Sequence, residues 1–327
     1  MPLLPLAQTP DPKATALAAA LLVAVVASLA FWGVMFQRYR AGRPILPREP
    51  HPVVPWQGID VLAVLAVYVM FTASAVGVVQ WTLRPELTEP VPIYSAEDSD
   101  MAHAVLQAVA TGHWWVLVLA AVAVVIVAPV AEEFLFRVLL QGWLEASVER
   151  WAPLLPNLRR LMPGASGPIL LSSLLFAAAH FKVAGSPYHT DFLVAMMLGT
   201  TVAGVLAVCF GVVWLRFRVG ATAADLGLVR ARPEASPGQK PPSALAGDVR
   251  LGLWWLAGLL GPIYAVQIAC HFTLPKYIAP DPIPLFFLAL GLGILYARTH
   301  RLVPCIVLHA GLNAVSLTLG WATLPGP

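Results

Sequence analysis

Eight long apolar segments, joined by charged or proline-rich loops, account for most of this chain. Apolar residues make up 59% of the sequence and charged residues only 11%, and the mean hydropathy is +0.77. A soluble domain carries about 25% charged residues, so the composition excludes that class. A helix needs about 20 mostly apolar residues to cross a bilayer. The sequence therefore predicts an all-α, polytopic transmembrane helix bundle of about eight spans.

The predicted spans differ in length, and the fourth and seventh are short. They cover residues 14–36, 58–81, 113–141, 167–182, 191–215, 251–273, 284–297 and 302–321. Within the first span, Ser28, Leu29 and Ala30 weakly resemble a signal-peptide cleavage site. The apolar run is too long for a signal peptide, however, and its positive charges follow it instead of preceding it. We therefore predict a retained membrane anchor.

The loops alternate in charge along the chain. Loops 37–56 and 216–250 are basic, as are the connection after the third span and the turn between the last two spans, whereas loop 82–112 is acidic. Positively charged loops mark the cytoplasmic side, and eight spans with both termini outside fit every loop. The net charge of +3 is small, so these charges indicate topology and no nucleic-acid partner. Two Pro-rich stretches, 153–168 and 231–247, are typical of connections.

Two adjacent glutamates interrupt the third apolar segment. Residues 114–130 carry no charge, and Glu132, Glu133 and Arg137 follow directly. Glu133 and Arg137 are four residues apart and share a helix face, so a buried ion pair would neutralise both but would leave Glu132 over. An unpaired carboxylate in apolar surroundings is more basic than one in water, as a general base near neutral pH must be. Pro129, one turn earlier, can free backbone groups that protein or water must then satisfy.

The fourth apolar segment ends in a histidine. Phe176 and His180 lie four residues apart on one helix face, and three alanines between them permit a neighbouring helix to approach closely. A lone histidine that closes an apolar helix is more often a structural hydrogen-bonding group than a catalytic one. Ser172 and Ser173 are interpreted as helix–helix contacts, because no aspartate lies nearby in the sequence to orient a histidine for a serine nucleophile.

The last apolar segment carries His309 and Asn313, again four residues apart. Both side chains can donate hydrogen bonds to an oxyanion that develops on a carbonyl group. In a helix bundle they can equally well cross-link helices, and the spacing alone does not separate these two roles. Gly291 and Gly293, just upstream, suggest a close approach of backbones near the same place.

The other reactive side chains carry weaker signals. The cysteines are interpreted as small apolar residues in packed helices, because their number is odd and no pair has metal-ligand spacing. They are Cys209, Cys270 and Cys305. His300 lies in a turn between two arginines and is expected to be solvated. The sequence contains no His-Glu-x-x-His motif, no Gly-rich phosphate loop and no Cys-x-x-Cys motif.

Together, three motifs resemble those of the CPBP family of intramembrane glutamic endopeptidases. This family includes CAAX proteases and bacterial, ABI-type proteins linked to bacteriocin processing and immunity. The motifs are Glu-Glu-x-x-x-Arg at Glu132 to Arg137, Phe-x-x-x-His at Phe176 to His180 and His-x-x-x-Asn at His309 to Asn313. Residues 290–299 also resemble the family's approach to its third motif. Each motif alone is weak, but all three occur in the family's order on apolar segments.

The resemblance implies a role for each motif. Glu132 would act as general base on a water molecule, helped by His180, and His309 and Asn313 would stabilise the oxyanion. Glu133 would position the site together with the arginine of its motif. No cofactor is expected. Two histidines and two glutamates could bind zinc in principle, but an obligatory metal is not favoured.

The resemblance also implies a single membrane domain over residues 1–327. Its catalytic core would cover about 114–182 and 284–321, and 183–280 would form an inserted helical segment with a cytoplasmic loop. Relatives commonly carry an Asp-Leu-Gly-Leu segment upstream of the glutamates, whereas here it lies at 225–228. An even number of inserted helices returns the chain to the same side of the membrane, so the site can still assemble.

The function predicted from these features is intramembrane endopeptidase. The substrate would be a membrane peptide or a lipid-anchored protein, including prenylated, CAAX-type proteins, and the location would be the bacterial inner membrane. Two alternatives from other classes remain open. One is a non-catalytic membrane immunity or scaffold protein that keeps the architecture and binds peptides. The other, less favoured, is a small-solute transporter, which paired, repeated halves would support; the sequence has no clear symmetry of that kind.

Overall fold

A computed structural model describes most of the helical part of the chain. The described residues are 12–46, 48–49, 53–83, 113–151, 153–154, 164–180, 190–229, 244–273 and 282–323. The acidic loop beyond residue 83, residues 155–163 of the predicted proline-rich connection and most of the Pro- and Gly-rich stretch 231–247 lie outside them. Every regular element within the described residues is a helix, which confirms the predicted all-α class.

The helices follow the predicted apolar segments closely. They are α1 (Pro12–Arg40), α2 (Gly58–Leu83), α4 (Trp114–Ala121), η2 (Val122–Val127), α5 (Ala128–Glu133), η3 (Phe134–Gln141), α6 (Gly142–Trp151), α8 (Ser166–Ala179), α9 (Thr190–Val219), α10 (Ala244–Thr273), α11 (Pro282–Thr299) and α12 (Leu302–Thr323). In the described part, 7 helical stretches are long and apolar enough to cross a membrane, and α8 is shorter. About eight spans is therefore confirmed.

The third span is longer than predicted. Helical structure runs without interruption from Trp114 to Trp151 and includes two π-helical segments, η2 and η3. The predicted end at residue 141 marks where the apolar run stops, because α6 carries charged residues such as Glu145 and Arg150. The end of an apolar run shows where contact with lipid or core ends. The helix itself can continue past that residue, as it does here. The glutamates consequently lie midway along this stretch and not near its end.

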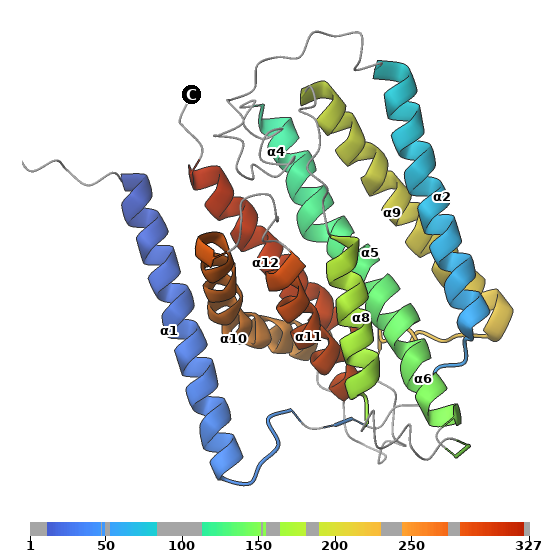
Figure 1. The fold of residues 1–327 in the computed structure, drawn as a ribbon, viewed down its shortest axis with the longest axis horizontal. Coiled ribbons are helices and arrows are strands. Elements are labelled where there is room, and N and C mark those ends of the chain that lie inside the picture. Colours follow the sequence, from blue (N-terminus) through green and yellow to red (C-terminus); the bar gives the residue numbers. More distant parts are fainter. Residues whose placement is uncertain are drawn as a thin grey trace, which may run out of the picture.

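The long stretch from α4 to α6 runs through the middle of the bundle. On one side of it, α2 packs along α9; on the other, α8 packs on α11, α10 on α12 and α1 on α10 (Figure 1). The stretch contacts both groups, through α9 and α2 on one side and through α8, α11 and α12 on the other. Its segment α5 and the start of η3 are therefore enclosed by helices that are distant in sequence.

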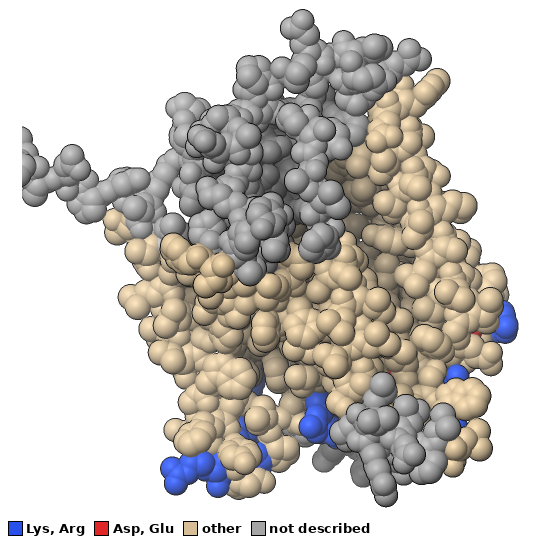
Figure 2. All heavy atoms as spheres, viewed as in Figure 1, with Lys and Arg blue, Asp and Glu red and all other residues tan. Residues whose placement is uncertain are grey.

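Arginine side chains gather at one end of the bundle. In Figure 2 the blue Lys and Arg atoms of the described residues lie toward the lower part of the molecule, where α1, α6 and α9 end in Figure 1. The arginines in the last turns of α1, α6, α9 and α11 define this arginine-rich end: Arg38, Arg40, Arg150, Arg216, Arg218 and Arg298. Large apolar side chains are exposed on the outer helices, as contact with lipid requires, among them Leu22, Val69, Phe217 and Phe272.

The first helix is fastened to α10 at a proline. Pro262 lies inside α10 and has no N–H, so the carbonyl of Gly258, four residues earlier, lacks its helical donor. Ser28 Oγ and Trp32 Nε1, both on α1, donate to that oxygen at 2.9 Å each. A proline inside a membrane helix is tolerated when a neighbouring helix satisfies the freed group in this way. The segment predicted to be an anchor thus packs as part of the bundle.

Candidate active site

A second backbone carbonyl that lacks its helical N–H donor because of a proline lies close to the glutamates in the same helix. In the π-helix η2 a carbonyl pairs with the N–H five residues later, and for Val124 that residue is Pro129, which has no N–H. Asn313 of α12 donates from Nδ2 to Val124 O at 2.8 Å. The freed backbone group predicted from Pro129 is therefore satisfied by protein. Asn313 fastens α12 to the helix that carries the glutamates, and π-helical segments of this kind occur frequently at functional sites.

Two histidines converge on Glu132 from two other helices. His180 Nε2, where α8 ends, is 3.6 Å from Glu132 Oε2, and His309 Nε2, on α12, is 3.7 Å from the same oxygen. The Glu132 side chain is 21% exposed and His180 28% exposed, whereas His309 is only 4% exposed. The structure thus brings together three residues that are far apart in the sequence. Glu132 and His180 are therefore the partly exposed members of the group, and His309 is its buried member.

The hydrogen bonds of the two histidines fix which ring nitrogen faces Glu132. His180 Nδ1 lies 2.8 Å from the carbonyl oxygen of Phe176, and His309 Nδ1 lies 2.9 Å from Glu133 Oε1. Carbonyl and carboxylate oxygens only accept hydrogen bonds, so Nδ1 of each ring carries a proton and donates it. Each ring then presents Nε2 to Glu132. The two imidazoles are held in matching orientation by partners other than Glu132, namely Phe176 O and Glu133.

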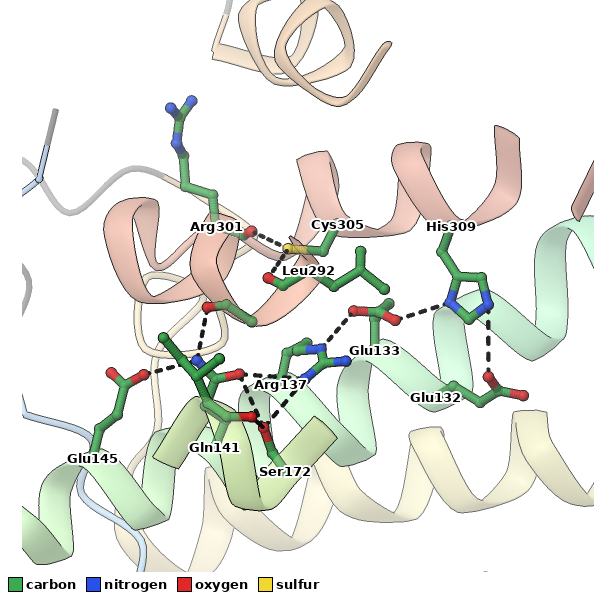
Figure 3. A network of polar contacts seen from close by, with 12 residues as sticks. Glu132, Glu133, Arg137, Gln141, Glu145, Ser172, Leu292, Arg301, Cys305 and His309 are labelled. Carbon is green, nitrogen blue, oxygen red and sulfur yellow. Dashed lines mark hydrogen bonds and ion pairs between the residues drawn. The ribbon is translucent and has the colours of Figure 1, made fainter. Parts of the chain in front are cut away.

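Glu133 and Arg137 form the predicted ion pair, and both side chains are completely buried. Arg137 Nε donates to Glu133 Oε2 at 3.2 Å, while the other oxygen, Oε1, accepts from His309. Glu133 therefore joins the arginine to the histidine (Figure 3). Burial of one charge without a partner would be very costly, so this carboxylate and this guanidinium stabilise each other within the apolar core.

Phe176 packs among the charged and imidazole groups. Its ring centroid is 4.6 Å from that of His180 and 5.8 Å from that of His309, and the guanidinium carbon of Arg137 lies 5.6 Å from it. The ring is fully buried, and the backbone carbonyl of the same residue orients His180. The spacing of Phe176 and His180 therefore reflects a physical requirement, because one residue both packs its ring against the histidine and accepts the hydrogen bond from Nδ1.

The sequence reasoning did not identify Gln141. Its side chain is fully buried and contacts Arg137 Nη1 at 3.4 Å through Oε1. Ser172 of α8 accepts from the same Nη1 at 3.3 Å, which agrees with its predicted role as a helix–helix contact. The missed signal was a spacing: Glu133, Arg137, Gln141 and Glu145 recur every four residues, so the polar face of the first motif continues for two more turns.

The expectation that His300 is solvated was wrong. His300 Nε2 lies 3.1 Å from Glu145 Oε2 and its side chain is 9% exposed. Beside it, Arg301 forms ion pairs with Asp248 and Glu49. The turn between the last two helices is therefore packed against α6, α10 and residue 49, because its polar side chains find partners there. The three cysteines carry no disulfide; Cys270 and Cys305 are buried and Cys209 is exposed.

None of the described residues form a group of three or more His, Cys, Asp or Glu side chains arranged to hold a metal ion. Nδ1 of both histidines and both oxygens of Glu133 have protein partners, whereas, in the described part of the chain, Glu132 Oε2 faces the two imidazoles without a hydrogen bond of its own. Chemically, the arrangement combines a partly exposed carboxylate, two oriented imidazoles and a buried, charge-balanced support. Such a set can accept a proton from a water molecule and donate hydrogen bonds to a developing oxyanion.

A comparison with protein families agrees with this chemistry. A family model described as type II CAAX prenyl endopeptidase, Rce1-like, matches residues 113–223 and 247–315. No curated protein and no solved structure matches the chain. The matched ranges cover more than half of the chain and contain all three motifs. The chain therefore belongs to the Rce1-like family of type II CAAX prenyl endopeptidases and is a multi-pass integral membrane protease.

Proposed function

We propose that Glu132 is the general base of a peptide hydrolase that uses no nucleophilic side chain. A water molecule close to Glu132 Oε2 would transfer a proton to the carboxylate, assisted by His180, while its oxygen attacks the peptide carbonyl carbon. The observation that carries this proposal is the convergence of His180 and His309 on Glu132 within 3.7 Å. These distances are slightly longer than hydrogen bonds, as is usual for catalytic contacts that shorten only when substrate binds.

His309 is proposed to stabilise the tetrahedral oxyanion from Nε2. Because its Nδ1 proton is already donated to Glu133, donation from Nε2 requires a doubly protonated imidazolium. The carboxylate of Glu133 supports that cation. Asn313 would add a second donor, since an amide nitrogen carries two N–H groups and Val124 takes one of them. Collapse of the intermediate breaks the C–N bond, and the leaving amine takes up the proton first accepted by Glu132.

The proposed substrate is a membrane-embedded or lipid-anchored peptide of the CAAX type. Glu132 lies within the apolar part of the Trp114–Trp151 stretch, so a scissile bond would have to enter the bundle at membrane depth, and a lipid anchor would hold it there. By the positive-inside rule the arginine-rich end faces the cytoplasm. The proposed location is the bacterial inner membrane. No obligatory metal is proposed, because Glu132 with two imidazoles can activate water without one.

The test is cleavage of a synthetic farnesylated peptide by the purified protein in detergent or liposomes. Wild-type protein is expected to release the C-terminal fragment, and Glu132→Gln and His180→Ala are expected to lower kcat by a factor on the order of 100 to 10,000. A matched control is Glu149→Gln, which removes a carboxylate from α6, distant from the motifs in sequence. Equal cleavage by wild type and Glu132→Gln would exclude the proposed mechanism. A non-prenylated peptide of the same sequence tests whether the lipid is required.

A further inference from the structure

We propose that Gln141 is a positioning residue for the reaction: it holds Arg137, and through Arg137 it orients Glu133 and His309. The inference rests on the proposed function, because it concerns the same site. Gln141 lies at the end of η3, two turns from Glu133, and contacts none of the residues proposed to touch substrate. Figure 3 shows it at the centre of the polar network that continues from the glutamates toward Glu145.

The Gln141 amide has polar partners at both its oxygen and its nitrogen. Oε1 accepts from Arg137 Nη1 and from Ser172 Oγ, both at 3.4 Å. Nε2 donates to the backbone carbonyl of Gly293 at 2.9 Å and to Glu145 Oε1 at 2.8 Å. An amide side chain offers two donors and two acceptor lone pairs. Both donors are used and Oε1 accepts from Arg137, while the single hydroxyl hydrogen of Ser172 is shared between Gln141 Oε1 and the backbone oxygen of Ile169 at 3.1 Å. If the amide were flipped, its N–H groups would face the guanidinium of Arg137, which is also a donor. Its oxygen would face the oxygens of Gly293 and Glu145, which are acceptors.

These four bonds connect separate elements of the bundle. Arg137 belongs to η3, Ser172 to α8, Gly293 to α11 and Glu145 to α6. The contacts with Arg137, Ser172 and Gly293 are buried and the one with Glu145 is partly buried, and a buried polar group that loses its partners is costly. One side chain therefore ties the glutamate-bearing helix to the helix that ends at His180 and to α11. A hydrocarbon side chain of the same size could fill the space but could not make these connections.

The glycine at 293 supplies independent support. A Cβ atom there would lie 2.9 Å from Ile169 Cγ2, 3.2 Å from Gln141 Oε1 and 3.6 Å from Arg137 Nη1. Two of these contacts are closer than ordinary van der Waals packing allows, so any larger residue would displace the amide or its neighbours. The close approach predicted from the sequence at this glycine thus makes room for the Gln141–Arg137 contact itself.

The effect of Gln141 reaches the reacting atoms through one continuous chain of contacts. Arg137 Nε binds Glu133 Oε2 at 3.2 Å, and Glu133 Oε1 binds His309 Nδ1 at 2.9 Å. His309 Nε2 then meets Glu132. Without Gln141, Nη1 would keep only Ser172 as an acceptor, so the guanidinium could turn and carry Glu133 with it. His309 would lose its fixed orientation, although the surface that binds substrate would be unchanged.

The experiment compares Gln141→Met with wild type in the peptide cleavage assay. Methionine keeps the length and volume of glutamine but makes none of its hydrogen bonds. We expect kcat to fall on the order of 10- to 100-fold, as for a small misplacement of a reacting group, with KM within about twofold because no substrate contact is lost. Ser28→Ala is the matched control. It removes a buried hydrogen bond between α1 and α10 and should leave kcat within about twofold.

A double-variant comparison separates positioning from general structural damage. In a Glu133→Gln background the proposed chain is already interrupted, so adding Gln141→Met should lower kcat by less than about twofold more. A merely structural role would give the same further loss in both backgrounds and would overturn the proposal. So would a Gln141→Met protein with wild-type kcat. If Gln141→Met does not fold, Ser172→Ala decides the question, since it removes the other acceptor of Arg137 Nη1.

A readout independent of cleavage distinguishes failure of this inference from failure of the proposed function. The ¹⁵N NMR resonance of His309 Nδ1 reports its bond to Glu133 whether or not the protein hydrolyses a peptide. Gln141→Met should shift that resonance, and Ser28→Ala should not. A wild-type protein without peptidase activity would refute the function and still leave the shift measurable. An unchanged resonance in Gln141→Met would refute the positioning role alone.

Discussion

Neutralising Glu133 should lower stability strongly, whereas neutralising its neighbour Glu132 should change stability little. Glu133 is completely buried and pairs with an equally buried Arg137 at 3.2 Å, whereas the Glu132 side chain is 21% exposed and lies 3.6 Å from the nearest imidazole nitrogen. Glu133→Gln leaves a buried guanidinium without its counter-ion. Glu132→Gln removes a carboxylate that is partly exposed and has no comparable partner. The two substitutions are chemically identical and one residue apart.

The structure sets the expected magnitudes. At 3.2 Å the attraction between two unit charges is about 5 kcal/mol for an effective dielectric constant of about 20. Removal of one member of a buried ion pair is measured to cost about 3–5 kcal/mol. We therefore expect Glu133→Gln to lower the free energy of unfolding by about 3–5 kcal/mol. Glu132→Gln should change it by less than about 1 kcal/mol, the scale of partly solvated ion pairs.

The assay is reversible unfolding in mixed detergent micelles, with the free energy extrapolated to zero denaturing detergent. A charge-balanced variant, Glu133→Gln with Arg137→Met, serves as the control. It leaves neither member of this pair charged, so it should recover most of the lost stability, because replacing both members of a buried pair is often close to neutral. It should nevertheless remain poorly active, since His309 still lacks its carboxylate. Glu132→Gln should show the reverse combination of normal stability and lost cleavage.

Two results would refute this reasoning. If Glu133→Gln and Glu132→Gln had equal free energies of unfolding within about 1 kcal/mol, burial would not distinguish the two carboxylates as the structure requires. If Arg137→Met failed to relieve the loss caused by Glu133→Gln, the cost would lie in shape or in other hydrogen bonds. The uncompensated charge would then not be its cause.

Three further predictions concern the proline-freed carbonyls and the metal. Asn313→Ala should lower the free energy of unfolding by about 1–3 kcal/mol, because it leaves Val124 O unpaired. In a Pro129→Ala background residue 129 regains an N–H, so the same substitution should cost less. Equal costs in both backgrounds would contradict this explanation. Ser28→Ala and Trp32→Phe should each lower the free energy of unfolding by only about 0.6 kcal/mol, because the remaining donor still satisfies Gly258 O. The double variant should lose more than the sum of the two single losses. Additive losses would argue against a shared acceptor. Peptide cleavage should persist in EDTA or phenanthroline, and a loss that added zinc restores would point to a metal instead.

Much of the fold could be predicted because the thickness of the bilayer sets the length of an apolar segment that crosses it. All eight predicted segments correspond to helices. The predicted and observed boundaries differ where a helix continues into polar residues. The third segment was predicted to end at residue 141, but the helix runs to Trp151, because charged residues end contact with lipid without ending a helix. Sequence periodicity also predicted the Glu133–Arg137 pair, since i,i+4 spacing decides that contact within one helix.

Contacts between helices were harder to predict. The three alanines before His180 were expected to admit a neighbouring helix, yet Ala178 and Ala179 are exposed and only Ala177 is buried. The buried face of α8 instead carries Ser172, Ser173 and Phe176. Composition indicates that a helix can pack closely, but rotation about its axis decides which residues do so. That rotation depends on partners such as Gln141 and Arg137, which belong to a distant part of the chain.

The position of Asn313 connects the two uses of polar side chains in this bundle. At Pro262, two donors from α1 satisfy one freed carbonyl, and they lie in a contact that serves only packing. At Pro129, the donor is Asn313, four residues from His309 on the same helix face. Satisfying Val124 O therefore fixes the register of α12 against the glutamate-bearing helix, and the same register brings His309 to Glu132 and Glu133. The Val124 carbonyl left without a helical donor by Pro129 therefore favours the alignment of α12 in which His309 contacts the glutamates.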